Sequence, residues 1–571
     1  MIHVIFALTL ILFITPLLPG VLGLVLPAVS WLPSLGYVEP NLSAFMTVSN
    51  WPGLWQSFML SLFTGVCSTL LALSASFFIL RRYWNTTRWQ KIERFLSPML
   101  AMPHVAFAIG FAFLLAPSGW IYRLLESTGF NTANSFNLIQ DRYGLGLLLG
   151  LAIKEIPFLL LMSISVLQQL QVNKLLAVAN GLGYSNREAW LKVILPQWLP
   201  KIRLPLFAVA AYGISVVDVA LIIGPSRPST LSVIVWQWFT DPDLAMLPRA
   251  AVGACLLLFT TMLGLALLSV TEWLCLRKYR QWQFHGASLS SIQTKGLSLT
   301  RLIVWLVLLI PLILTPLLFT WSIAQRWRFP DLSPSRYSLR FWEQESQAIF
   351  ELACNSIMLA LISSVIALIM TVCCLEYRDK FQKSIPTWCI AIPLVTPQLS
   401  LLFGIQISTY WIAGQHFIVW VIWSHIFFVF PYMYLALDGP WRSYDNRLDQ
   451  CAKSLGLTSW QTWWRVKRPL IMPAIYMAMA VGMSVSLAQY LPTQMLGAGR
   501  ISTVTTEAVA LASGQDRRVT AIYGLLQGIL PLVFFTIALS ASHFSGRFYQ
   551  QKSQQRSNST DDIICGKPHY K

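Results

Sequence analysis

Long apolar segments, separated by short polar ones, dominate the hydrophobic pattern of the chain. A helix needs about 20 apolar residues to cross the hydrocarbon core of a bilayer, and about twelve segments approach that length. They lie near residues 4–29, 54–80, 97–116, 144–170, 201–224, 250–275, 302–325, 348–375, 386–405, 417–438, 471–496 and 520–545. The pattern predicts an all-α integral membrane protein with about twelve transmembrane helices.

The polar segments carry charge unevenly. The 571 residues are 11% charged, against about 25% in soluble domains, and the net charge is +18. Alternate gaps between the predicted spans, together with the C-terminal tail, hold 29 of the 41 Lys and Arg residues. By the positive-inside rule, these gaps and both termini are predicted to be cytoplasmic. Helical spans predict a bacterial inner membrane, because outer-membrane spans are normally β-barrels. The basic charge therefore reports topology and implies no nucleic-acid partner.

Two polar segments share one plan, "LAVANGLGYSNREAWLKVILP" at 176–196 and "DQCAKSLGLTSWQTWWRVKRP" at 449–469. Leu175, Ala179, Leu182 and Gly183 match Leu448, Ala452, Leu455 and Gly456 at a constant offset of 273 residues, and so do Trp190 and Trp463, and Pro196 and Pro469. Weaker matches extend the repeat to six spans in each half. An even number of spans returns the chain to its starting side, so the halves are predicted to be parallel repeats.

The repeat gives a domain plan. It comprises a first six-helix domain at 1–275, a cytoplasmic linker at 276–301, a second six-helix domain at 302–546 and a disordered cytoplasmic tail at 547–571. Prolines at matched positions, Pro103 and Pro397, and Pro157 and Pro431, are predicted to kink their spans.

Each polar segment predicts a helix, a sharp turn and a second helix. Leu175, Ala179 and Leu182 follow the i, i+4, i+7 spacing of an amphipathic helix. Gly183 and Gly456 occupy the position of a left-handed C-cap. "SNRE" from Ser185 and "TSWQ" from Thr458 fit the capping box that starts a new helix, and this helix is predicted to end near Pro196 or Pro469. We call residues 175–196 and 448–469 the first and second lever; the alternative is a pair of ordinary cytoplasmic loops.

This pattern resembles the permeases of binding-protein-dependent ABC importers, whose cytoplasmic signature is EAA, three residues, Gly, nine residues and Ile-x-Leu-Pro. Ala177 and Gln450 stand where the family has Glu, which puts in doubt any contact that needs a carboxylate there. The predicted ATPase-coupling residues are Ala177, Val178, Ala179, Gly183, Ser185, Glu188 and Pro196 in the first lever, and Gln450, Cys451, Ala452, Gly456, Thr458, Gln461 and Pro469 in the second.

The resemblance implies a type I importer permease fold and two copies of an ABC ATPase subunit seated on the levers. It also implies a periplasmic substrate-binding protein. Two halves fused in one chain resemble the thiamine and iron(III) branch, and "KEIPFLL" and "LLAPSGW" resemble in particular the Ynj-type permeases. The chain has no G-x-x-x-x-G-K-[ST] loop to cradle phosphates. ATP and Mg²⁺ are therefore expected on the partner ATPase, with no catalytic residue, cofactor or metal in this chain.

A few charged residues are candidates for a pathway or gate. Lys154, Glu155 and Asp218 fall within predicted spans, where an ionised side chain costs about 2.5–3.5 kcal/mol. They could form a structural ion pair, Lys154 with Asp218 or Glu155, or contact the substrate. Arg227 and Arg500 occupy equivalent places after the fifth spans, where they could line an outer gate, contact a docked binding protein or be solvated loop cations. The lone histidines His104 and His425 are expected to be satisfied within the core.

A second class of function also accounts for two six-span halves. A secondary active transporter with a 6+6 repeat would have the same number of spans, driven by an ion gradient. The duplicated levers favour the ABC permease, because a secondary transporter has no ATPase to engage. The sequence does not identify the substrate.

Overall fold

The computed structural model describes residues 2–33, 36–129, 137–284, 296–409, 416–514 and 516–564. The first half contains α1 (Ile2–Ile14), α2 (Leu17–Ala28), α3 (Ser43–Ser49), α4 (Leu54–Tyr83), α5 (Thr87–Ala101), α6 (His104–Leu115), α7 (Trp120–Ser127), α8 (Leu145–Gln169), α9 (Val172–Gly181), α10 (Asn186–Ala189), the π-helix η2 (Trp190–Ile194), α11 (Leu195–Trp198), the 3₁₀-helix η3 (Leu199–Ile202), α12 (Arg203–Ser215), α13 (Asp218–Ile223), α14 (Leu231–Phe239) and α15 (Met246–Phe284).

The second half has a similar but not identical order. It contains α16 (Gly296–Ser322), a short antiparallel pair β1 (Ala324–Arg326) and β2 (Arg336–Tyr337), α17 (Arg340–Phe381), α18 (Thr387–Val395), α19 (Gln398–Thr409), α20 (Phe417–Arg442), α21 (Arg447–Ser454), α22 (Ser459–Thr462), the π-helix η4 (Trp463–Lys467), α23 (Arg468–Leu487), α24 (Leu491–Leu496), α25 (Val504–Ala512) and α26 (Arg517–Ile564).

The all-α membrane fold is confirmed, with fewer continuous spans than the sequence predicts. In the part of the chain that the structure describes, ten helices are long and apolar enough to cross a membrane, or eleven if α18 and α19 count as one bent span. The remaining expected span, 201–224, is interrupted between α12 and α13. Its counterpart in the second half is interrupted between α23 and α24.

Hydroxyl groups satisfy the backbone where these two spans break. Ser232 Oγ donates a hydrogen bond to the carbonyl of Val216 at 2.6 Å, directly after α12 ends. Thr505, which stands at the equivalent position 273 residues later, donates from Oγ1 to the carbonyl of Leu487 at the end of α23. A freed carbonyl without such a partner would be costly in a bilayer, so both breaks are built into the protein interior.

The matched prolines act in two ways. Pro397 separates α18 from α19, which meet at a bend of 100°, and Pro103 is the N-cap of α6, directly after α5 ends. The third span of each half is therefore broken where the sequence predicts a kink. Pro157 and Pro431 instead lie inside α8 and α20, which continue past them.

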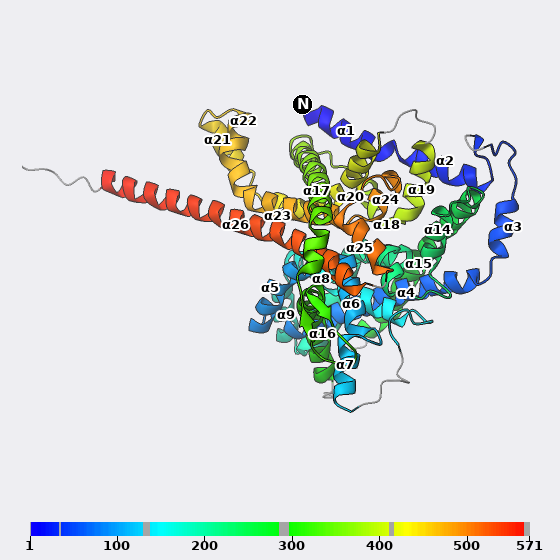
Figure 1. The fold of residues 1–571 in the computed structure, drawn as a ribbon. Helices are drawn as coiled ribbons and strands as arrows, with labels where there is room; N and C mark the ends of the chain where they lie inside the picture. Colours follow the sequence, from blue (N-terminus) through cyan, green and yellow to red (C-terminus); the bar gives the residue numbers. More distant parts are fainter. Residues whose placement is uncertain are drawn as a thin grey trace, which may run out of the picture.

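The first spans of the two halves reach across the boundary between the halves (Figure 1). Helices α1 and α2 pack on α17 and α19 of the second half, and α2 also packs on α15 of its own; α16 packs on α6 of the first half and on α26 of its own. Glycines allow the close approach of α2 and α19: a Cβ atom on Gly23 would lie 2.0 Å from the carbonyl oxygen of Gly404. Ser408 Oγ also donates to the carbonyl of Pro19 at 2.8 Å. The segments 1–275 and 302–546 are therefore in contact through their first spans.

The linker and the tail differ from their expected boundaries. Helix α15 continues to Phe284 and α16 begins at Gly296, so only 285–295 of the expected linker lies outside the described residues. Helix α26 continues to Ile564, through most of the tail expected to be disordered, because that segment contains Gln, Lys and Arg and no Gly or Pro before Gly566. Residues 565–571 lie outside the described residues.

Replacement of Gly23 by Ala tests the glycine contact between the halves. The added methyl group overlaps the backbone of Gly404, so we expect a loss of roughly 1–3 kcal/mol of stability and a lower midpoint of thermal unfolding in detergent. Gly20→Ala on the same helix is the control, because its Cβ would lie 3.4 Å from the nearest atom, a side-chain carbon of Leu401. Equal midpoints for the two variants would contradict the proposed tight contact.

Candidate coupling levers and pathway residues

The first lever has the predicted helix, turn and helix. Gly183 follows α9 with φ +84°, in the left-handed region that glycine adopts without strain. The Gly183 amide donates to the carbonyl of Asn180 at 3.0 Å, and the Tyr184 amide donates to that of Ala179 at 3.1 Å. This pair of bonds is a Schellman motif, which reverses the chain direction within a few residues.

A complete capping box starts α10. The amide of Glu188 donates to Ser185 Oγ at 3.3 Å, and the amide of Ser185 donates back to the Glu188 carboxylate at 3.0 Å. The two free amides at the helix start are therefore satisfied reciprocally, as "SNRE" predicts.

The second lever has the same geometry with different residues. Gly456 has φ +85°, its amide donates to the carbonyl of Lys453 at 2.9 Å, and the Leu457 amide donates to that of Ala452 at 3.1 Å. The capping box joins Thr458 and Gln461 through bonds of 3.0 and 3.3 Å. The predicted local fold is confirmed in both copies.

Each lever continues into a turn of π-helix, which the sequence does not predict. The two π-helices, η2 (Trp190–Ile194) and η4 (Trp463–Lys467), begin at positions 273 residues apart. Pro196 and Pro469 then lie in the first turn of the next helical segment, where a missing amide hydrogen is tolerated. The prediction that these prolines end the levers is wrong, because helical structure runs through both of them into the fifth span.

The outward faces of the levers are more apolar than predicted. Ala179 and Ala452 are buried, but Leu182 and Leu455 are 73% and 83% exposed at the turns. The predicted stripe of Leu175, Ala179 and Leu182 is therefore wrong at its last member, because the Schellman turn points this leucine outward. Ala177, Val178, Gln450 and Cys451 are also exposed.

Aromatic packing attaches the first lever to the membrane helices. The buried Trp190 and Trp198 lie against Phe77 of α4, with ring centroids 6.1 and 5.6 Å apart. Trp84, at the end of α4, donates from Nε1 to Asn173 Oδ1 on α9 at 3.2 Å. The first lever is therefore held against the end of α4.

Buried charge attaches the second lever. The Lys467 side chain is 2% exposed, and its Nζ lies 2.8 Å from Glu376 Oε1 and 3.0 Å from Asp379 Oδ2 on α17. Trp463 Nε1 donates to Glu376 at 2.9 Å and Trp441 Nε1 donates to Asp379 at 3.0 Å. The second lever is thus attached to its membrane helix by an ionic cluster, whereas the first lever is attached by aromatic packing. Burial and the neighbouring Asp449 carboxylate raise the pKa of the adjacent Tyr444.

The predicted pathway charges pair in an unexpected way. Glu155 Oε1 accepts from His104 Nε2 at 2.8 Å, whereas Lys154 donates to the carbonyl of Met99 at 3.1 Å. No ion pair of Lys154 with Glu155 or Asp218 occurs among the described residues, because the side chain of Lys154 reaches the backbone at the end of α5 instead. Asp218 lies beside Tyr212, whose ring lies 4.7 Å from that of His104, between ring centroids.

Glu155 and Asp218 of the first half lie near residues of the second half. Tyr432 of α20 interacts electrostatically with Glu155, and Tyr490, at the break between α23 and α24, interacts with Asp218. We call His104, Glu155, Tyr212, Asp218, Tyr432 and Tyr490 the interface cluster. His425 is satisfied by Ser486 and Thr493, at 2.7 and 2.9 Å, as expected for a core histidine.

The two arginines outside the spans have different surroundings. Arg227 is exposed and lines a pocket of about 450 Å³, while the guanidinium of Arg500 lies 4.4 Å from the centre of the Phe417 ring. Their sequence positions are equivalent, but their contacts are not.

No protein-family model matches the chain. Over 534 residues it is 31% identical to the inner membrane ABC transporter permease protein YnjC of Escherichia coli (strain K12), across 93% of this chain and 94% of that protein. The chain belongs to the ABC transporter permease family.

As an ABC permease of the Ynj type, the protein is a multi-pass protein of the inner membrane and the membrane subunit of an ABC transporter. This result decides against a secondary transporter.

The cluster around Lys467 was not predicted from the sequence. The i, i+3 spacing of Glu376 and Asp379, which places two carboxylates on one helix face, could have indicated it.

Replacement of Lys467 by Met tests how this permease holds its second lever. Two carboxylates would lose their shared cation, at a cost of about 3 kcal/mol, so amide hydrogen exchange across 447–467 should become roughly 100-fold faster. The matched control is Lys453→Met on the exposed face of α21. The prediction fails if exchange in the second lever is unchanged, or if the first lever loosens equally.

Proposed function

We propose that this permease is the membrane subunit of an ABC importer and that both levers dock on ATPase subunits. The observation that carries the proposal is the duplication of one rigid geometry: glycine turns with φ +84° and +85°, two capping boxes and two π-helices. Connecting loops without a shared function are not expected to have the same detailed geometry in both halves.

The exposed residues of the levers support docking on a protein surface. Leu182 and Leu455 occupy equivalent tips and are almost fully exposed, as contact residues are before a partner covers them. Ala177 and Gln450 are exposed on the same helices. We propose that the contact relies on apolar packing at the tips and on the helix geometry, without the carboxylate that the family places at these positions.

The partner subunits and the topology of the transporter follow from this arrangement. Two levers call for two copies of the ATPase subunit, which would bind ATP and Mg²⁺, and this chain would carry out no catalysis. The side of the protein that carries the levers and most of the Lys and Arg residues would face the cytoplasm, as would both termini. A periplasmic binding protein would deliver the substrate to the opposite side.

The interface cluster is our proposed pathway or gate. Glu155 and Asp218 belong to the first half and Tyr432 and Tyr490 to the second, so movement of one half against the other changes their separation. Lys154, Arg227 and Arg500 lie outside this cluster, and we propose them as further charged residues of the pathway or gate.

Photo-crosslinking from the levers tests the coupling proposal. Cys451 is an exposed native thiol on α21, and Val178 is its equivalent in the first lever. A photoactivatable maleimide on Cys451, or on a cysteine in V178C, should capture the co-expressed ATPase subunit in the intact complex. Leu182→Ser and Leu455→Ser should each weaken that complex about 30-fold or more, because residues central to an interface contribute about 2 kcal/mol or more.

Controls separate docking from general damage. The same label on Cys354, which is exposed on α17, should capture no ATPase, and Leu339→Ser removes an exposed leucine from outside the levers without effect. Gly183→Val should abolish capture because valine cannot adopt φ +84° without strain, whereas Gly181→Ala, with open space around its Cβ, should not. Capture from Cys354 alone would overturn the proposal.

A further inference from the structure

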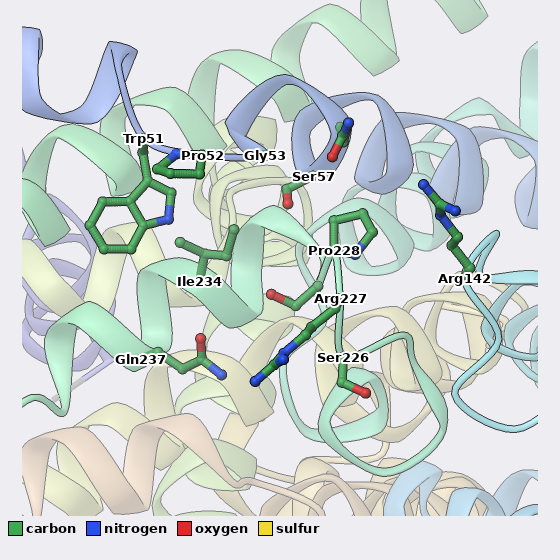
Figure 2. A pocket seen from close by; sticks show the side chains of 12 residues that line it. Trp51, Pro52, Gly53, Ser57, Arg142, Ser226, Arg227, Pro228, Ile234 and Gln237 are labelled. Carbon is green, nitrogen blue, oxygen red and sulfur yellow. The ribbon is translucent and has the colours of Figure 1, made fainter.

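A pocket opens at the end of the molecule opposite the first lever. It has a volume of about 450 Å³ and lies between the start of α4, the segment before α8, residues 226–229 and α14. Since α4 has 30 residues, its two ends are about 45 Å apart. Arg142 and Arg227 line the pocket from different segments, and Figure 2 shows Arg142 at one side and Arg227 extending toward Gln237 at the other.

The pocket has a strong bias in charge. Arg142 and Arg227 both line it, and no Asp or Glu does so among the described residues. The neighbouring Asp141 is buried, and its carboxylate already accepts the amides of Tyr143, Leu145 and Gly146 at the start of α8. Neither arginine has a hydrogen bond or ion pair within the described parts of the chain, so both guanidinium groups are available to an anion.

A buried hydroxyl adds a second and independent sign of a ligand. Ser57 lines the pocket, is fully buried, and its Oγ has no hydrogen-bond partner among the described residues. A buried hydroxyl left without a partner costs about 1–3 kcal/mol. A donor of this kind, facing a cationic pocket, is suited to an oxyanion.

The second half shows that this arrangement is specific to the first. Ser356, the counterpart of Ser57, donates to the carbonyl of Leu352 at 2.7 Å and accepts the amide of Val504 at 2.9 Å. In the first half, the corresponding amide, that of Leu231, is bound by Ser61 instead, one turn further along α4. This shift leaves Ser57 free. The two equivalent arginines also differ. The guanidinium of Arg500 packs on the Phe417 ring, whereas no ring contact of Arg227 occurs among the described residues.

We propose that the pocket is a binding site for an oxyanion, a phosphate or carboxylate group, held by Arg142, Arg227 and the Ser57 hydroxyl. Gly53, the N-cap of α4, also lines the pocket and has no side chain, so it leaves room for a ligand beside Ser57. The oxyanion belongs either to a small anionic molecule or to the headgroup of an anionic lipid, and both present the same chemistry to these three residues.

Protection of the arginines from phenylglyoxal, a reagent selective for guanidinium groups, tests the site in the full-length permease. Peptide mass spectrometry follows the modification of Arg142 and Arg227, with the exposed Arg336 as internal control. In lipid-free detergent, inorganic phosphate or succinate should slow modification of both arginines and leave Arg336 unchanged if the ligand is a free anion. In nanodiscs, phosphatidylglycerol without added anion should protect them, and phosphatidylcholine should not, if the ligand is a lipid headgroup.

Two serine variants decide whether the site is built as proposed. Ser57→Ala removes the free hydroxyl and no existing bond, and should weaken protection about tenfold, because hydrogen bonds to charged groups contribute 1.5–3 kcal/mol. Ser76→Ala is matched to it, since Ser76 is also buried on α4 with an unpartnered hydroxyl but lies outside the pocket. Equal modification rates in every arm, or protection that Ser57→Ala leaves intact, would overturn the proposal. The measurement requires neither ATPase nor transport, so it is independent of the coupling function.

Discussion

A bilayer offers no hydrogen bonds, and this single constraint organises the protein. Every break in a span exposes backbone groups that cost several kcal/mol in hydrocarbon, so a break survives only where the protein itself supplies partners. Ser232 and Thr505 supply them at equivalent positions of the two halves. The interruptions of the fifth spans consequently face the interior, where the two halves meet and where Glu155, Asp218 and the tyrosines gather.

The levers are joined to these breaks without an intervening loop. From Asn186 to Ser215 the chain is helical throughout, passing through a π-helix, and from Ser459 to Leu487 it is helical again. Each glycine turn is therefore joined by unbroken helical backbone to the point where the fifth span is interrupted. Aromatic packing on α4 and the ion cluster on α17 tie each of these helical segments to a second helix. Mechanical continuity of this kind is what a coupling role would require.

Local features were the most predictable part of the structure. Gly183, Gly456 and both capping boxes follow from short-range backbone chemistry, and each has the geometry that its residues predict. Features that depend on contacts between distant segments were not predictable. The partner of Glu155 is His104, 51 residues away, and the contact of the first span with the opposite half rests on glycines that look unremarkable in the sequence. The π-helices escaped prediction because no residue type marks them.

The contact of the first span with the opposite half also sets the order in which the protein can be made. Pro19 and Ser408, which are hydrogen-bonded in the finished fold, are 389 residues apart. At about 5–20 residues per second, the ribosome needs roughly 20 to 80 seconds to deliver the second after the first. During that interval, α1 and α2 lack their partners α17 and α19, although α2 can already pack on α15 of its own half. Completion of the first half thus awaits translation of the second, and the two repeats mature as one unit.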